Sequence, residues 1–297
     1  MTYSIVARDP KTGEMGVAVQ SHYFSVGSVV TWARAGIGAV ATQSMTEIRY
    51  GPLGLELMAA GKSAAEALRG LLAVDPKPDI RQVAMVDSKG RTAAHTGKRC
   101  IPYAGNTQGK SVSCQGNIMR NGRVWTAMRK SYEKNARLPL PERLVAALEA
   151  GEAAGGDARG KQSAAILVVS GEKTSSYWEG RVVELRVEDH PEPVPELKRL
   201  LRFKRGYDWV DKGDGYIASG KLAAALKAYE RALELVPEVD EIKYWVGVSL
   251  LPTKRRERGL DLLKEVFAKD RSYVKMTKAI VKAGSLPIDP SVREAYP

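Results

Sequence analysis

The spacing of apolar residues changes near residue 190 of this 297-residue chain, and that change limits the possible folds more than any other feature. Before it, short apolar runs alternate with glycine-rich turns and with two blocks of helical periodicity. After it, apolar and small residues recur at helical spacing. We therefore expect a mixed α and β domain over residues 1–190, a linker over 191–204 and an all-α domain over 205–297.

In residues 1–190 the sequence predicts strands that pair with the strands next to them along the chain. SIVARD and MGVAVQS are separated by DPKTGE, which suits a hairpin turn, and SKG centres a second hairpin in RQVAMVDSKGRTAAHTG. Further strands are expected at GIGAVATQS, QSAAILVVSG and GRVVELRVED. Helices are expected at YGPLGLELMAAGKSAAEALRGLLAVD, with a break at Gly61 and an N-cap at Ser63, at RVWTAMRKSYEKN and at LPERLVAALEAGEAAGG. This order predicts two antiparallel sheets stacked face to face with helices outside them.

The C-terminal part carries a repeat. DHPEPVPELK is proline-rich and polar, as linkers often are. Beyond it Gly213 and Gly247 stand 34 residues apart, and KGDGYIASGKLAAALKAYERALELVP resembles a tetratricopeptide repeat closely. The second unit matches less well, because Pro252 and a basic run interrupt its first helix. Two repeat units and a capping helix near YVKMTKAIVKAG are too few for an independent solenoid. We therefore expect them to pack against a neighbouring molecule or against the main domain.

Thr2 stands at the start of the first predicted strand, directly after Met1. A hydroxyl can attack an amide only if a base removes its proton, and a free α-amino group, with a pKa of about 7.7–8.0, is a candidate base on the same residue. If Met1 is removed, Thr2 presents both its hydroxyl and a neutral amine at one end of a core strand. Many proteins begin Met-Thr by chance, so the wider pattern matters more than this position.

That wider pattern resembles a known family. The segments that carry the resemblance are TYSIVARDPKTGEMGVAVQS, VGSVVTWARAGIGAVATQS, RYGPLGLELMAAGKSAAEAL, QGNIM and LEAGEAAGGDARGKQSAAILVV. Together they resemble the family called domain of unknown function 1028, over roughly residues 2–190. That family is placed among the N-terminal-nucleophile (Ntn) hydrolases. The resemblance implies a four-layer α/β/β/α sandwich of two antiparallel sheets and a hydrolase ancestry, but it implies no substrate.

Comparison with better-known members of that superfamily supports Thr2 and reveals one departure. In proteasome β subunits the mature chain starts on the nucleophilic threonine and runs directly into a strand, as Thr-Tyr-Ser-Ile-Val does here. Those subunits place a lysine near the threonine, and SVGSVVTWARAG offers no counterpart. The base is then the terminal amine alone or another group.

Other candidate site residues follow strand ends. Gln115 and Asn117 flank a glycine, where an amide or backbone N–H would act as an oxyanion donor, or where the asparagine would simply complete a turn. Asp157 and Arg159 either pair with each other across a glycine-rich turn, or Arg159 holds a substrate carboxylate. His22 ends the second strand and is the alternative activating group. Its neighbour Ser21 points to the opposite face of that strand.

Gln43 and Arg49 belong to a loop between the GIGAVATQ strand and the next helix, a kind of position that often carries binding groups. We therefore assign Gln43, Arg49, Gln115, Asp157 and Arg159 to substrate binding. The catalytic candidates are Thr2, His22 and Asn117.

Composition restricts the partners. The chain has two cysteines and three histidines, so we expect reduced thiols, no metal site and no cofactor. It lacks a secretion signal and an apolar membrane span, which favours the cytoplasm. Lys and Arg exceed Asp and Glu by 25 to 19 in residues 1–192 and by 21 to 15 in residues 193–297. The tail is thus the more basic part, but its charges alternate as on a solvated helical surface, and we do not expect nucleic acid to bind.

Two functions remain open from the sequence. The first is an Ntn-type amidohydrolase that cleaves a C–N bond in a small molecule or short peptide, with repeats that bind a protein partner. The second is a non-catalytic Ntn-like scaffold that oligomerises and presents the repeats. In both cases we expect a homodimer.

Overall fold

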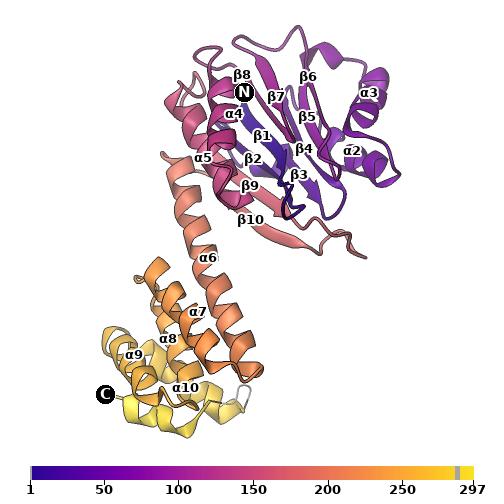
Figure 1. Cartoon of the computed structure of the whole chain (residues 1–297). Coiled ribbons are helices and arrows are strands. Elements are labelled where there is room, and N and C mark those ends of the chain that lie inside the picture. Colours follow the sequence, from indigo (N-terminus) through magenta and orange to yellow (C-terminus); the bar gives the residue numbers. More distant parts are fainter. Residues whose placement is uncertain (1, 285–287) are drawn as a thin grey trace. The chain divides into compact units, whose positions relative to one another are not determined.

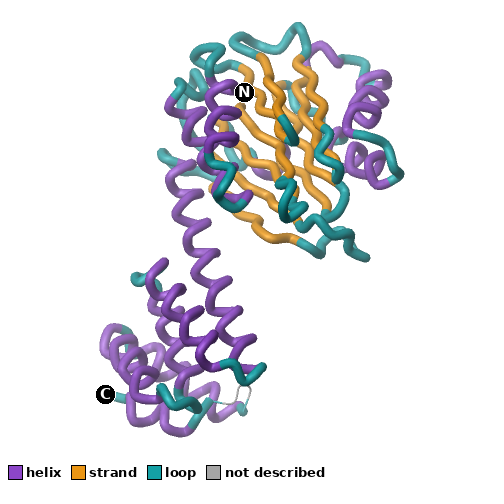
Figure 2. Tube along the Cα trace, in the orientation of Figure 1, coloured by secondary structure: helices purple, strands orange, loops and turns teal. Residues whose placement is uncertain are grey.

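The structure, a computed structural model, describes residues 2–284 and 288–297. The chain divides into two units, one ending at Leu201 and the other beginning at Arg202. The fold is mixed α and β in the first unit and helical in the second, which confirms the coarse sequence prediction (Figure 2).

Two antiparallel sheets make up the centre of the first unit (Figure 1). In the described residues the larger sheet has six strands in the order β10-β9-β2-β1-β8-β7, and the smaller has four in the order β3-β4-β5-β6. The strands of the larger sheet are β1 (Thr2–Arg8), β2 (Met15–Ser21), β7 (Gly105–Gly109), β8 (Val112–Asn117), β9 (Ser163–Val169) and β10 (Arg181–Val187). Those of the smaller are β3 (Thr31–Arg34), β4 (Gly38–Ser44), β5 (Arg81–Asp87) and β6 (Thr92–Thr96).

Helices cover the outer face of each sheet. One cluster of buried residues joins the six-stranded sheet to α4 (Val124–Lys134) and α5 (Leu140–Ala153). Another joins the four-stranded sheet to α2 (Tyr50–Ala59) and α3 (Ala64–Val74). A third cluster contains Val17 of β2, Ala41 of β4 and Val86 of β5, so the inner faces of the two sheets pack on each other. The short α1 (Gly27–Val30) and the 3₁₀ turn η1 (Pro78–Ile80) complete this unit.

Alternation along β1 decides which residues reach the inner layer. Tyr3, Ile5 and Ala7 belong to the cluster beneath α4 and α5, whereas Val6 belongs to the cluster between the sheets. Because successive side chains of a strand point to opposite faces, Thr2 and Ser4 share the inner face with Val6. The first residue of β1 therefore faces the other sheet.

The local signals of the sequence agree with these elements. Both predicted hairpins form, between β1 and β2 and between β5 and β6. Ser63 caps α3 in a capping box, in which its hydroxyl accepts from the Glu66 N–H and the Glu66 carboxylate accepts from the Ser63 N–H. The predicted break at Gly61 separates α2 from α3.

The second unit is helical. Its elements are the continuation of α6 (Pro193–Ala218), then α7 (Leu222–Leu235), α8 (Asp240–Leu250), α9 (Arg256–Lys269), α10 (Ser272–Ala283) and the 3₁₀ turn η2 (Pro290–Ala295). Two clusters form its core, one centred on α7 and α8 and one that joins α8, α9 and η2.

The predicted linker over residues 191–204 needs correction, because α6 begins at Pro193 and is helical through the rest of that range. Pro193 and Pro195 lie in its first turn, where backbone N–H groups have no intrahelical partner, so proline is tolerated there. A proline-rich stretch thus marks a helix start. Among the described residues, none of the helices has the length and hydrophobicity that crossing a bilayer requires.

Candidate functional site

Thr2 lies at the edge of the inner layer, between two partner strands. In the sheet it pairs with Asn117 of β8, and its neighbour Tyr3 pairs with Gln20 of β2. Thr2 is 3% exposed. Its Oγ1 donates a hydrogen bond to the Ser21 Oγ at 3.0 Å, across from β1 to the end of β2. The Thr2 hydroxyl, which the sequence analysis predicts to be the nucleophile, is therefore held in one orientation by the Ser21 hydroxyl.

The main-chain carbonyl of Thr2 is also held. It accepts hydrogen bonds from the Gln43 Nε2 at 3.0 Å and from the Asn117 Nδ2 at 3.4 Å. Gln43 comes from β4, so this contact bridges the two sheets. Two of the sequence-predicted residues therefore meet at Thr2, and both are fully buried.

Gln82 of β5 is the centre of this arrangement, and the sequence reasoning missed it. Its Oε1 accepts from the Gln43 Nε2 at 2.8 Å and from the Asn117 Nδ2 at 2.9 Å. Its Nε2 donates to the Gly116 carbonyl at 2.8 Å and to the Thr96 Oγ1 at 3.0 Å. One signal in the sequence could have identified Gln82. It stands two residues before Ala84 in the strand RQVAMVD, so the two side chains share the face of the strand that points to the other sheet.

Gln115 joins the same arrangement one step further inside. Its Nε2 donates to the Ser4 Oγ and to the Ala41 carbonyl, both at 3.2 Å, and the Ser4 Oγ donates to the Gln43 Oε1 at 2.6 Å. We call Gln43, Gln82, Gln115 and Asn117 the amide cluster. Gln43 and Asn117 bond directly to Gln82, whereas Gln115 bonds to Ser4 and Ala41 and its Oε1 has no hydrogen-bond partner in the described part of the chain. Hydrogen bonding of most of these polar atoms is what makes them stable in a core.

Tyr3 fixes β1 from the opposite face. Its hydroxyl donates to a Glu152 carboxylate oxygen of α5 at 2.7 Å. Burial, and then the nearby Glu152 charge, raise the pKa of Tyr3 well above its ordinary value, so the phenol keeps its proton. The strand that carries Thr2 is therefore fixed on both sides.

Asp157, Arg159 and His22 form a separate group beside the end of β2. The carboxylate of Asp157 is buried and pairs with Arg159, whose Nη2 lies at 2.8 Å and Nε at 3.2 Å. It also accepts the backbone N–H of His22 at 3.0 Å. Of the two alternatives for Arg159, the structure shows the pair across the turn. The His22 ring lies at the surface, and its Nδ1 is 3.2 Å from the Lys161 carbonyl oxygen.

Arg49 is not brought to these groups. It precedes α2, is largely exposed and forms an ion pair with Glu47 at 3.0 Å. Local charge at the loop surface accounts for its position, so the prediction that it binds substrate has no support from its contacts.

The arrangement contains a positioned hydroxyl and buried amides, and within the described residues no lysine or arginine side chain is hydrogen-bonded to Thr2. Removal of Met1, on which the amine base depends, concerns a residue outside the described ones. In residues 2–284 and 288–297 no group of three or more His, Cys, Asp or Glu side chains is placed to hold a metal ion.

The first unit of the chain resembles proteins of a known family. The model of a family described as a family of unknown function, DUF1028, matches residues 2–197. The crystal structure of protein SPO2555 from Silicibacter pomeroyi, assigned to DUF1028, superposes with a TM-score of 0.61 at 30% sequence identity. This match covers 68% of the present chain and 88% of that protein.

A curated protein is similar over a shorter stretch. Superkiller protein 3 of Saccharomyces cerevisiae is 27% identical over 114 residues, which is 35% of this chain. The chain spans only 8% of that protein's length, so the likeness concerns a segment of it.

Proposed function

The chain belongs to the DUF1028 family, whose function is unknown, and we propose that it is an N-terminal-nucleophile amidohydrolase that cleaves a C–N bond in a small molecule or short peptide. The observation that carries the proposal is the position of Thr2. It is the first residue of a central strand, its hydroxyl is oriented by Ser21, and its carbonyl is held by two amides. Two stacked antiparallel sheets between helical layers are the architecture expected of an Ntn sandwich.

The reaction would proceed in two steps once Met1 is removed. The Thr2 Oγ attacks the substrate carbonyl carbon while the Thr2 amine accepts the hydroxyl proton. That proton passes to the leaving nitrogen as the C–N bond breaks, which leaves an ester on Thr2. Water then attacks the ester, the amine again accepts a proton, and its return to Oγ releases the acid and restores the threonine.

The amides nearest Thr2 have a defined role in this proposal. Both donor hydrogens of the Asn117 amide point at acceptors, one of them the Thr2 carbonyl at the longer distance of 3.4 Å. This weaker contact is the one that would exchange for an oxyanion, and losing one such donor typically raises a barrier by about 2.7–4 kcal/mol. Gln43 and Gln115 would position the strand, and Arg159, paired with Asp157, would hold the adjacent turn.

The test uses protein whose N-terminus has been determined by mass spectrometry. On a panel of small amides, Thr2→Ala should abolish turnover and Thr2→Ser should keep part of it, because serine retains the hydroxyl. Thr12→Ala is the matched control, since Thr12 is exposed in the turn at the far end of the same hairpin. Equal turnover by Thr2→Ala and by a chain that truly begins at Thr2 would show that Thr2 is not the nucleophile. His22 with a nearby hydroxyl would then be the next candidate.

We extend the proposal to the second unit, as tetratricopeptide-like repeats that bind a protein partner. A Cβ on Gly213 of α6 would meet the ring of Tyr229 of α7, and a Cβ on Gly247 of α8 would meet Leu263 of α9. In both cases the residue that the glycine contacts follows it by the same number of positions in the chain. The two glycines themselves are 34 residues apart. Equivalent close contacts at equivalent places are what a 34-residue helical repeat requires.

One observation favours the second candidate, a non-catalytic scaffold. Thr2 is 3% exposed, and the amide cluster forms its hydrogen bonds with itself and with the surrounding strands, so little of the machinery faces a ligand. A scaffold would oligomerise, and the homodimer stays a prediction in both cases. Light scattering at micromolar concentration tests it, and a monomer would contradict it. Turnover lost in Thr2→Ala, with the dimer retained, would favour the enzyme.

A further inference from the structure

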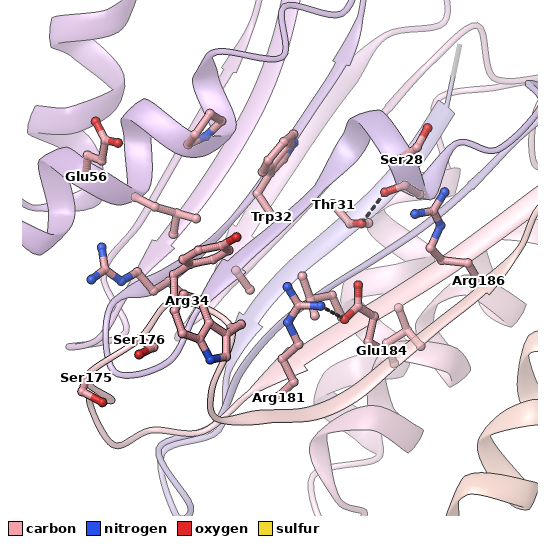
Figure 3. Close-up of a pocket in the computed structure, with 18 residues that line it drawn as sticks. Ser28, Thr31, Trp32, Arg34, Glu56, Ser175, Ser176, Arg181, Glu184 and Arg186 are labelled. Atoms are coloured by element: carbon pink, nitrogen blue, oxygen red, sulfur yellow. Dashed lines mark hydrogen bonds and ion pairs between the residues drawn. The ribbon is translucent and has the colours of Figure 1, made fainter.

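A cavity of about 650 Å³ opens between the free edges of the two sheets, away from the amide cluster (Figure 3). Its walls come from β3 at the edge of the smaller sheet, β10 at the edge of the larger, helices α1 and α2, and the loop before β10. Figure 3 shows Trp32 and Arg34 on the β3 side and Arg181, Glu184 and Arg186 on the β10 side. Neither Thr2 nor any member of the amide cluster lines it.

One aromatic wall of this cavity is rigid. The ring of Trp32 packs directly over Gly51 of α2, where a Cβ would lie 2.3 Å from the ring. Its Nε1 donates to the Val29 carbonyl at 3.1 Å. Because both the face and the polar edge of the indole are held, Trp32 offers a fixed surface for a flat ligand.

The second aromatic wall stands on an anchored loop. Tyr177 and Trp178 meet edge to face with ring centroids 5.1 Å apart, and they are 66% and 62% exposed. The base of their loop is tied by a hydrogen bond from the Ser170 N–H to the Gly180 carbonyl at 2.8 Å. The Gly36 N–H, from the turn after β3, donates to the Ser170 carbonyl at 3.0 Å. Two large exposed rings on a tied loop are poorly explained by folding alone.

The charges that line the cavity leave one cation available. Arg181 pairs with Glu184, and Arg186 pairs with Glu188 at 2.8 Å and donates to Ser25. Arg34 has no hydrogen bond or ion pair to another side chain among the residues that the structure describes, although it lines the cavity from the same strand as Trp32. A guanidinium presents paired donors that match a carboxylate or a phosphate.

We propose that this cavity binds a planar aromatic anion, with the ring system between Trp32 and the Tyr177–Trp178 pair and the anionic group on Arg34. The volume lies within the usual range of about 300–1,000 Å³ for small-molecule sites. The anionic group is a carboxylate or a phosphate, which the guanidinium recognises in the same way. The proposal does not depend on Thr2 chemistry, since no residue is shared between the two places.

Isothermal titration calorimetry with two probe pairs tests the proposal. Naphthalene-2-carboxylate against naphthalene-2-carboxamide tests a carboxylate, and adenosine 5′-monophosphate against adenosine tests a phosphate. In at least one pair the anion should bind about tenfold or more tightly than its neutral partner, because a charge-assisted hydrogen bond is at stake. The pair that shows the preference identifies the anionic group.

Variants assign that preference to residues. Arg34→Gln should reduce the anion preference to within about threefold, while Arg69→Gln, on an exposed arginine of α3, should leave it unchanged. Trp178→Ala should weaken the anion and its neutral partner alike, by about threefold to tenfold, because it removes ring contact and no charge. Thr2→Ala should bind as the unmodified protein does, which separates this proposal from the proposed hydrolase.

Three outcomes would overturn the proposal. The first is the absence of an anion preference in both probe pairs. The second is a preference that survives Arg34→Gln. The third is a dimer in sedimentation that Trp178→Ala converts to monomer while the unmodified protein binds no probe, because a second copy of the chain would then cover the cavity.

Discussion

Four amide side chains, those of Gln43, Gln82, Gln115 and Asn117, occupy an inner layer that apolar residues would otherwise fill. An unpaired amide in such a place costs about 1–3 kcal/mol, so the cluster is stabilised by the bonds of Gln82 to Gln43 and Asn117 and by bonds to main-chain carbonyls and hydroxyls. Such a network also has few alternative arrangements, and it holds the start of β1 in a single position.

We predict that Gln82→Leu destabilises the first unit by roughly 2–3 kcal/mol, because it keeps the side-chain volume and removes the shared partner of Gln43 and Asn117. Urea denaturation followed by circular dichroism measures the change. Gln108→Leu is the control, since Gln108 is an exposed residue of β7. Equal midpoints for the two variants would mean that the network contributes little to stability.

The individual site residues were only partly predictable. Strand ends pointed to Gln43, Gln115 and Asn117, and the structure brings all three into one network with Thr2 or its neighbour Ser4. Gln82 was missed because a single glutamine in an apolar strand gives no signal until the opposing sheet is known. Whether any of them takes part in a reaction stays a prediction.

At the scale of elements, hairpins and helices followed from turn residues and periodicity, whereas two strands did not. β3 has four half-buried residues at a sheet edge, and β7 reads GNTQG, which has no alternation of apolar residues. Their pairing is supplied by β4 and β8, so tertiary context decides it. The placement of β1 between β2 and β8 likewise needs a contact more than 100 residues away in sequence.

Two glycines of α6, Gly213 and Gly215, provide a test of the proposed repeat. Alanine normally stabilises a helix relative to glycine by about 1 kcal/mol. At Gly213, however, a Cβ would lie 2.2 Å from the Tyr229 ring, so we predict that Gly213→Ala destabilises the second unit. Gly215→Ala, in the same helix with nothing within 4 Å, should stabilise it by about 0.5–1 kcal/mol.

Thermal unfolding of the two variants measures this difference. The unfolding temperature should fall in Gly213→Ala and rise in Gly215→Ala. Gly247→Ala should behave as Gly213→Ala does, because its Cβ would meet Leu263 at 2.8 Å. If Gly213→Ala and Gly215→Ala stabilise the protein equally, the close packing at the 34-residue spacing is not what holds these helices together.

At the scale of the molecule, the periodicity of the sequence changes near residue 190, whereas the structure divides the chain between Leu201 and Arg202. This division lies within the sequence of α6, where no turn or glycine marks a boundary. Composition could not reveal it, because a helix that runs through a boundary has the same local pattern on both sides. Each unit nevertheless has buried clusters of its own, within residues 3–201 and within residues 203–296.

Because each unit has its own core, we predict that a cavity created by mutation in one unit destabilises that unit alone. Phe267 is fully buried in the second unit, where its ring centroid lies 6.2 Å from that of Tyr244 and 5.7 Å from that of Tyr296. Phe267→Ala should destabilise that unit by about 3–5 kcal/mol. Native-state hydrogen exchange followed by mass spectrometry should then show α8 and α9 exchanging more than about a hundredfold faster, while β1 and β9 keep their protection.

The reciprocal variant completes this prediction. Leu144→Ala removes a fully buried side chain from the cluster beneath α5, so it should expose β1 and β9 to exchange and leave α8 and α9 unchanged. Two opposite patterns of protection would establish that each unit unfolds from its own core. If Phe267→Ala accelerated exchange in β9 as much as in α9, the two units would share one cooperative transition, and the second unit could not be treated as a module with its own stability.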